Sequence, residues 1–248
     1  MSAYETFASV YDLFMEQVEY DEWLDHIHAV WKKYGITPKT ILDLGCGTGS
    51  ILLPLAQEGF DVIGVDLSPE MLTEADHKAM EAGVSVRLAC QDMTELDLGE
   101  QADCILSLCD CMNYLIEDGQ LESAFQSIAA HMKKESLFLF DMNTEYKFRE
   151  VLGQKVCGAA EEAAAYIWEN DYDEEEKINE YYVSFFIEQE NGLYERVEEY
   201  HYERAYSIEE IEQTLQAAGL ALLEVTDGYS FAKPHEKSER LLFAARLK

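Results

Sequence analysis

The sequence is poor in basic residues and has no long apolar run. Among its 248 residues, Lys and Arg number 18 against 50 Asp and Glu, which gives a formal net charge of -32. Nucleic-acid binding relies on Lys and Arg to displace counterions from phosphates, so this balance speaks against a nucleic-acid partner. No apolar run reaches membrane-spanning length, and residues 1–5 lack the basic and apolar regions of a signal peptide. We therefore expect a cytoplasmic protein with no membrane partner.

The six cysteines show neither metal-site nor disulfide-framework spacing. No two of them stand as CxxC, and no cluster of His and Cys has the spacing of a zinc site. Three of them fall in apolar, strand-like runs, where a free Cys behaves as a small hydrophobic residue. The pattern predicts a reduced protein without a metal centre.

From residue 40 onward, apolar runs alternate with amphipathic segments of helical length. We expect strands over 40–44, 61–66, 84–90, 102–109 and 136–142, and helices over 50–58, 69–82 and 118–133. Strands separated by such helices are typical of a parallel sheet with helices on both faces. A helical segment rich in aromatic residues, 4–34, precedes this pattern.

The alternation changes after Asn143. Residues 163–206 alternate at period two and include Asn191-Gly192, a strong hairpin signal, so we expect antiparallel strands near 164–171, 178–190 and 193–206. One face of the last strand carries Tyr194, Arg196, Glu198, Tyr200, Tyr202, Arg204 and Tyr206. This face either packs against the main sheet or forms a lid over a substrate. A helix capped by Ser207 and strands over 220–226 and 240–247 complete the pattern.

The most informative segment is the glycine-rich turn at residues 45–49. An apolar segment typical of a buried strand ends at this turn, and a helix is expected to begin directly after it. The glycines allow positive φ and the close approach of a ligand, which would then lie in front of the helix N-terminus. A phosphate-binding P-loop would need a Lys that is missing. A dinucleotide site would need a third glycine at position 50, which is Ser50.

Two acidic residues narrow the ligand further. Asp66 ends the second strand, where a carboxylate can accept hydrogen bonds from both hydroxyls of a ribose. Asp92 ends the third strand, where a carboxylate can accept from an exocyclic amine while the next backbone N–H donates to a ring nitrogen. Together they indicate an adenine nucleoside.

The segments ILDLGCGTGS, VIGVDLSPEML and Gln91-Asp92-Met93 resemble three motifs of class I S-adenosylmethionine-dependent methyltransferases. The resemblance covers residues 40–144 and 207–248. It implies an α/β fold: a doubly wound, Rossmann-like, seven-stranded sheet in the order 3-2-1-4-5-7-6 with the last strand antiparallel. It also implies a helical cap at 1–38, a cofactor domain at 39–145 and 207–248, and a small antiparallel β insertion at 146–206. The cap and the insertion resemble, more loosely, small bacterial methyltransferases and glycine N-methyltransferase-like enzymes.

The resemblance also assigns residues to the cofactor S-adenosylmethionine. The glycine turn would line the methionine part of the cofactor, and Asp43 would help to hold its amino group. Asp66 would bind the ribose, and the third motif would bind the adenine. The full set is Tyr11, Trp23, Asp43, Gly45, Cys46, Gly47, Gly49, Asp66, Leu67, Met71, Gln91, Asp92, Met93 and Cys109. Of these, Tyr11 and Trp23 are candidates to close over the cofactor, although such aromatics are commonly core residues.

Residues after the fourth strand would face the methyl acceptor, because ligands bind at the carboxyl ends of parallel strands. Asp110, Asn113 and Tyr114 are the catalytic candidates; Asp110 could instead cap a helix, and Asp141 and Asn143 could also reach the pocket. The expected function is methyl transfer to a small molecule. The alternatives are an RNA or protein acceptor, a cofactor-binding module without catalysis, and transfer of another group from the same sulfonium. The acceptor and the oligomeric state stay open.

Overall fold

The computed structural model describes residues 11–12, 15, 18–160, 164–189 and 191–248. The first part of the helical segment expected over residues 4–34 lies largely outside these ranges. Within them, no helix combines the length and the apolar character needed to cross a membrane.

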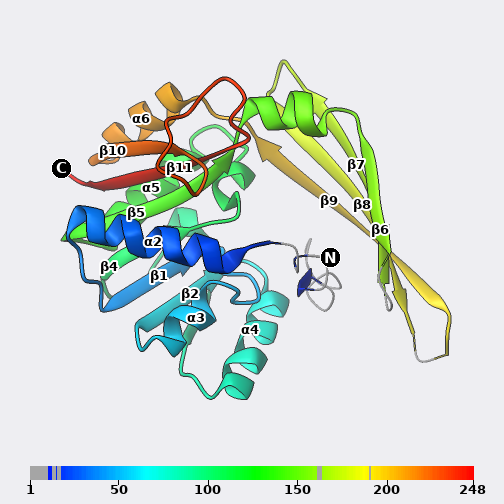
Figure 1. Ribbon diagram of the computed structural model, residues 1–248, viewed down its shortest axis with the longest axis horizontal. Coiled ribbons are helices and arrows are strands. Elements are labelled where there is room, and N and C mark those ends of the chain that lie inside the picture. The colour runs from blue at the N-terminus through cyan, green and yellow to red at the C-terminus, as the bar shows by residue number, and fades with distance from the viewer. Residues whose placement is uncertain (1–10, 13–14, 16–17, 161–163, 190) are drawn as a thin grey trace.

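Seven strands form one mixed sheet in the order β10-β11-β5-β4-β1-β2-β3 (Figure 1). They are β1 (Thr40–Leu44), β2 (Asp61–Asp66), β3 (Arg87–Cys90), β4 (Ala102–Ser107), β5 (Met132–Asn143), β10 (Leu220–Asp227) and β11 (Arg240–Leu247). The first five pair in parallel, whereas β11 runs antiparallel to both β5 and β10. If β10 and β11 are counted as the sixth and seventh strands of this sheet, the order is 3-2-1-4-5-7-6 and the last strand is antiparallel. The predicted fold is therefore confirmed.

Helices cover both faces of this sheet. They are α2 (Tyr20–Tyr34), α3 (Leu52–Gln57), α4 (Pro69–Ala82), α5 (Gln120–Ala130) and α6 (Ile208–Ala217). Successive side chains of β5 point to opposite faces of the sheet and belong to two separate hydrophobic cores. Phe138 and Phe140 pack in the core that includes residues of α5 and α6, whereas Leu137 and Leu139 pack in the core that includes residues of α2 and α3. Strands buried on both faces explain why they read as continuous apolar runs.

The predicted helix caps are present. The Ser68 hydroxyl accepts from the Met71 N–H at the start of α4, and Ser207 and Glu210 form a capping box on α6. Several expected boundaries shift by a few residues. In particular, β4 ends at Ser107 and not at residue 109, because Cys109 and Asp110 take left-handed backbone angles, with φ of 62° and 57°.

A second sheet of four strands stands beside the first (Figure 1). It consists of β6 (Val156–Ala160), β7 (Ala164–Asp173), β8 (Ile178–Glu188) and β9 (Tyr194–Arg204), each antiparallel to its neighbour. A π-helical segment, η3 (Lys147–Leu152), leads into it. The sequence predicted three strands and missed β6, whose Gly and Ala residues give little hydrophobic alternation.

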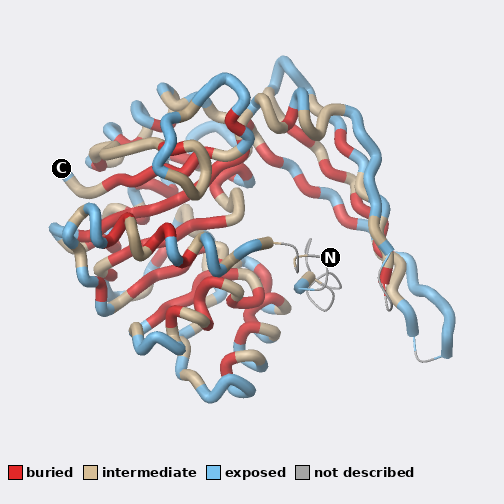
Figure 2. The backbone as a smooth tube through the Cα atoms, viewed as in Figure 1, coloured by how far each residue is buried: buried red, intermediate tan, exposed pale blue. Residues whose placement is uncertain are grey.

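The face of β9 that carries Tyr200 and Tyr202 is the outer one, which corrects the expectation that it packs against the main sheet. Tyr200 is 51% exposed, whereas the alternate residues Glu199, His201 and Glu203 are buried. Figure 2 shows buried and exposed segments alternating along this strand. Register explains the choice, because His201 pairs with the buried Tyr181 of β8. The end of the expected face does pack on the main domain: Arg204 and Tyr206 donate to the carbonyl oxygens of Ile116 and Leu115, respectively.

Candidate cofactor and acceptor site

The glycine turn follows β1 at the carboxyl edge of the sheet. Gly45, Gly47 and Gly49 all have positive φ, of 70°, 52° and 87°. A Cβ on Gly45 would lie 2.4 Å from Cys111 Sγ, so packing requires this glycine. A Cβ on Gly47 would meet nothing within 4 Å, which leaves its backbone open to a ligand.

Asp66 holds the glycine turn against the start of α4. One carboxylate oxygen accepts from Gly47 N at 2.8 Å and the other from Ser68 N at 2.9 Å. Burial raises the pKa of this carboxyl, while these backbone donors oppose the rise. The next side chain, Leu67, is 66% exposed, which offers an apolar surface to a flat ring.

Asp43 is a buried carboxyl without a hydrogen-bond donor among the described residues. It is 3% exposed and stands two positions before the glycine turn. Burial, with a smaller contribution from the Asp66 charge, raises the pKa of Asp43 to about 8. A buried carboxyl without a partner is costly, so a cationic amino group is the ligand that this position fits.

This pKa predicts that cofactor binding releases a proton. At pH 6.5 Asp43 holds a proton in the unliganded protein, whereas a neighbouring ammonium would favour its carboxylate. We expect close to one proton released per S-adenosylmethionine bound, measured as a dependence of the calorimetric binding enthalpy on buffer ionisation enthalpy. Asp43→Asn removes the release, and Asp76→Asn on the exposed side of α4 keeps it. A binding enthalpy independent of buffer in the wild type contradicts the assignment.

Asp92 combines a capping role with a vacant acceptor. One of its oxygens accepts from both the Thr94 N–H and the Thr94 hydroxyl at 2.8 Å, at the start of the short helix η1 (Met93–Glu95). Its other oxygen has no partner in the described ranges, so an exocyclic amine can donate to it. The Gln91 side chain bonds to the backbone of Asp97, which holds this turn.

The described part of the N-terminal segment touches the glycine turn. Asp12 accepts from the Thr48 hydroxyl and from Lys78 Nζ, each at 2.6 Å. Tyr20 hydrogen-bonds to both Tyr11 and Ser50, which places Tyr11 beside the turn. These contacts fit the closing role expected of Tyr11.

Trp23 has a packing role in this structure. Its ring stacks on Tyr229 with centroids 4.2 Å apart and planes 7° apart, and the Arg240 guanidinium lies 5.6 Å from its centroid. The ring is partly buried against the core of the main fold, and its expected contact with the cofactor stays a prediction.

An ion-pair network fixes the loop after β4. The Asp141 carboxylate accepts from the backbone N–H groups of Cys109 and Asp110, at 3.2 and 2.6 Å, and from the Tyr229 hydroxyl. Arg240 donates to Asp110 at 2.6 Å and to Asp141 at 2.8 Å. These bonds hold the two left-handed residues, whose conformation is otherwise unfavourable.

Asp110 is therefore a poor candidate for a general base. Burial by itself would raise its pKa, but the Arg240 and Lys147 charges outweigh burial and lower it. A carboxylate paired with a guanidinium has little tendency to take a proton. The structure assigns Asp110 to holding the loop.

Asn113 and Tyr114 differ in what they can do. The Asn113 amide is fully buried: it donates to the carbonyl oxygens of Asn143 and Arg204 and accepts from Asn143 N. That leaves it a positioning role. Tyr114 is partly exposed, at the end of the 3-10 helix η2 (Cys111–Tyr114), so its hydroxyl can face an acceptor.

Comparison with known proteins identifies the family. A model described as "Methyltransferase domain" matches residues 41–135. A "Putative methyltransferase" of Geobacillus sp. (strain WCH70) is 37% identical over 98% of this chain and 99% of its own length. The solved S-adenosylmethionine-dependent methyltransferase from Clostridium acetobutylicum ATCC 824 is 35% identical, with a TM-score of 0.89 and 98% of each chain covered. The chain is a class I S-adenosylmethionine-dependent methyltransferase.

The methyltransferase carries buried polar residues that the sequence did not single out. Glu199, His201 and Glu203 lie on the inner face of β9, and Asn143 Nδ2 donates to Glu203 Oε2 at 3.1 Å. Burial, and then the Asp110 charge, raise the pKa of Glu203 well above its usual range. The signal was available, since Glu-x-His-x-Glu at period two places three polar residues on one face of a strand.

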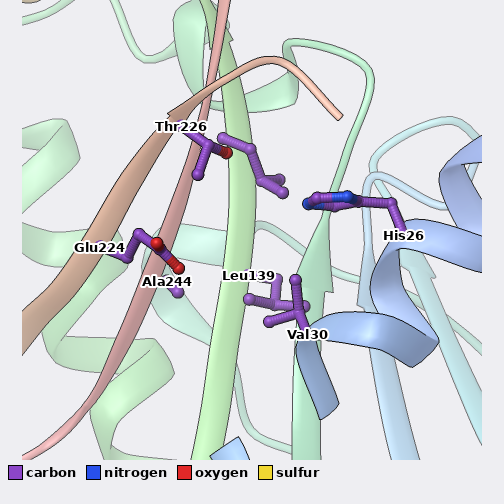
Figure 3. A pocket seen from close by; sticks show the side chains of 7 residues that line it. His26, Val30, Leu139, Glu224, Thr226 and Ala244 are labelled. Atoms are coloured by element: carbon purple, nitrogen blue, oxygen red, sulfur yellow. The ribbon is translucent and has the colours of Figure 1, made fainter. Parts of the chain in front are cut away.

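The methyltransferase also contains a small cavity, seen from close by in Figure 3. Its volume is about 10 Å³, and it lies between α2 and the sheet, lined by His26, Val30, Leu139, Glu224, Thr226, Leu242 and Ala244. This volume suits a single water molecule. None of the residues expected to bind the cofactor or the acceptor lines it, so it is no substrate site.

Proposed function

We propose that this methyltransferase methylates a small molecule bound between the loop after β4 and the inner face of the second sheet. The observation that carries the proposal is the contact of Glu203 with Asn143 at the carboxyl edge of β5. It brings the buried polar face of β9 to the acceptor side of the main sheet. A wall of this kind encloses a small molecule more readily than a polymer.

The charge and the relatives support the same proposal. A net charge of -32 disfavours an RNA acceptor. A Streptomyces venezuelae relative, 30% identical over 51% of this chain, is named a dTDP-3-amino-3,4,6-trideoxy-alpha-D-glucopyranose N,N-dimethyltransferase, which acts on a small molecule. The cytoplasmic location stays a prediction from the composition.

We assign cofactor binding to residues that have an accessible backbone, an exposed apolar side chain or a carboxylate oxygen able to accept a further hydrogen bond. Asp43 would hold the amino group, Gly47 the methionine part, Asp66 the ribose, and Leu67 and Asp92 the adenine. The bound cofactor supplies a methyl group on a positively charged sulfur. The protein then has to orient the acceptor and exclude water, and orientation can supply about 7–11 kcal/mol of the barrier.

The test follows the methyl group. The protein is incubated with S-adenosylmethionine tritiated in its methyl group and with either the small-molecule filtrate or the macromolecular fraction of a bacterial extract. We expect tritium in new small molecules, and none with Asp66→Asn. Label confined to RNA or protein contradicts the proposal, and so does cofactor binding without transfer to either fraction.

A further inference from the structure

We propose that His201 is the general base of this methyltransferase, acting through the Tyr114 hydroxyl and oriented by Glu199. The inference rests on the proposed function and defines its acceptor chemistry. The acceptor would be a molecule whose attacking atom carries a removable proton, such as an ammonium or a hydroxyl group.

The three side chains form a chain of polar contacts from the loop into the second sheet. Tyr114 Oη lies 3.5 Å from His201 Nδ1, and His201 Nε2 lies 3.1 Å from Glu199 Oε2. The first distance is long for a hydrogen bond, as is common at catalytic contacts before a substrate binds. The Tyr114 and His201 rings meet edge to face, with centroids 6.0 Å apart.

The geometry selects one tautomer of His201. A carboxylate only accepts, so Nε2 carries the hydrogen toward Glu199 and the neutral ring keeps a lone pair on Nδ1. That lone pair faces the Tyr114 hydroxyl. A base oriented by a third group is the arrangement found in hydrolase triads, although here the hydroxyl relays a proton and forms no covalent bond.

Burial and neighbouring groups favour a base at this position. His201 is 7% exposed and Glu199 is 5% exposed, so water competes weakly for their contacts. Glu203 on β9 and Tyr181 on β8 flank the imidazole, and burial raises the pKa of both well above their usual ranges. Glu199, whose Oε2 lies 3.1 Å from His201 Nε2, is the carboxyl in contact with the imidazole on its own strand.

The proposed step conserves protons and electrons. The acceptor group gives its proton to Tyr114 Oη while the Tyr114 proton passes to His201 Nδ1. The freed lone pair of the acceptor forms the new bond to the methyl carbon, and the electron pair of the broken sulfur–carbon bond stays on sulfur. Glu199 stabilises the imidazolium, which returns its proton to solvent after the product leaves. Acceptors without a removable proton need no such relay.

The first arm of the test determines the tautomer of His201 in a complex in which no methyl transfer takes place. Nitrogen-15 NMR is recorded on the full-length protein saturated with S-adenosylhomocysteine, and His201 is assigned from the signals lost in His201→Gln. We expect the neutral form protonated on Nε2, disturbed by Glu199→Gln and unchanged by Glu198→Gln on the outer face of the same strand. A ring protonated on Nδ1 would overturn the relay.

The second arm measures rates against pH, with the small-molecule filtrate as acceptor source. We expect His201→Gln and Tyr114→Phe to lower transfer at neutral pH by about 100-fold, with partial recovery as pH rises and unchanged affinity for S-adenosylhomocysteine. His77→Gln, on the exposed side of α4, keeps the wild-type profile. A His201→Gln rate and pH profile equal to the wild type would overturn the inference. Absence of transfer by the wild type would instead reject the proposed function, and the NMR arm still decides the geometry.

Discussion

Asp66→Asn is expected to weaken binding of S-adenosylhomocysteine by about 100-fold or more. Two ribose hydroxyls would donate to this carboxylate, and hydrogen bonds to a charged group each contribute about 1.5–3 kcal/mol. The same carboxylate accepts from Gly47 N and Ser68 N, so the substitution also loosens the turn that the cofactor contacts. Isothermal titration calorimetry measures the loss.

Asp76→Asn is the matched control, because it makes the same change on the exposed side of α4. It should bind S-adenosylhomocysteine like the wild type. Circular dichroism and thermal unfolding should show that the Asp66→Asn protein is folded. An affinity within a few-fold of the wild type would show that Asp66 does not hold the ribose.

Arg240→Met is expected to cost about 3–5 kcal/mol of folding free energy at neutral pH. The substitution leaves Asp110 and Asp141 without their shared cation in a buried network, and unpaired buried charges are strongly destabilising. Urea unfolding monitored by tryptophan fluorescence measures the change. Arg149→Met is the control, because the ion pairs of Arg149 lie on the surface, and its unfolding midpoint should stay close to that of the wild type.

The deficit of Arg240→Met should shrink in acid. The pKa of Asp110 is lowered in the folded wild type, so its contribution to stability is present at neutral pH and is lost as pH falls through that lowered value. The two proteins should therefore differ most near pH 7, and the difference should be least once the pH has fallen below the lowered pKa of Asp110, itself below the ordinary pKa of an aspartate. A difference that is constant across this range would mean that packing, and not charge, accounts for the loss.

The sequence predicted the cofactor side of the fold well because its signals are local. The glycine turn, Asp66 and Ser68 lie within one strand–turn–helix unit or at the start of the next, and each is recognisable from its immediate neighbours. The strand order followed from the family resemblance. The contacts of Asp43 and Asp92 with a cofactor remain predictions, although the structure leaves both with unused bonding capacity.

The acceptor side was harder because its contacts join distant parts of the chain. Arg240 stands 130 positions from Asp110, so no local pattern could show that this carboxylate is already paired. The expectation that the tyrosine face of β9 packs against the main sheet was wrong for a similar reason. Both of its faces carry polar residues, and only the pairing of His201 with Tyr181 on β8 decides which one is buried.

Asn113 joins the two points where the second sheet enters and leaves the main fold. Its amide donates to the carbonyl oxygen of Asn143, where β5 ends, and to that of Arg204, where β9 ends. These two ends, which lie 30 and 91 positions along the chain from Asn113, meet at this single side chain. Because both ends are held at this one point, a change of sequence or length within the segment between them need not move β5 or the strands beside it.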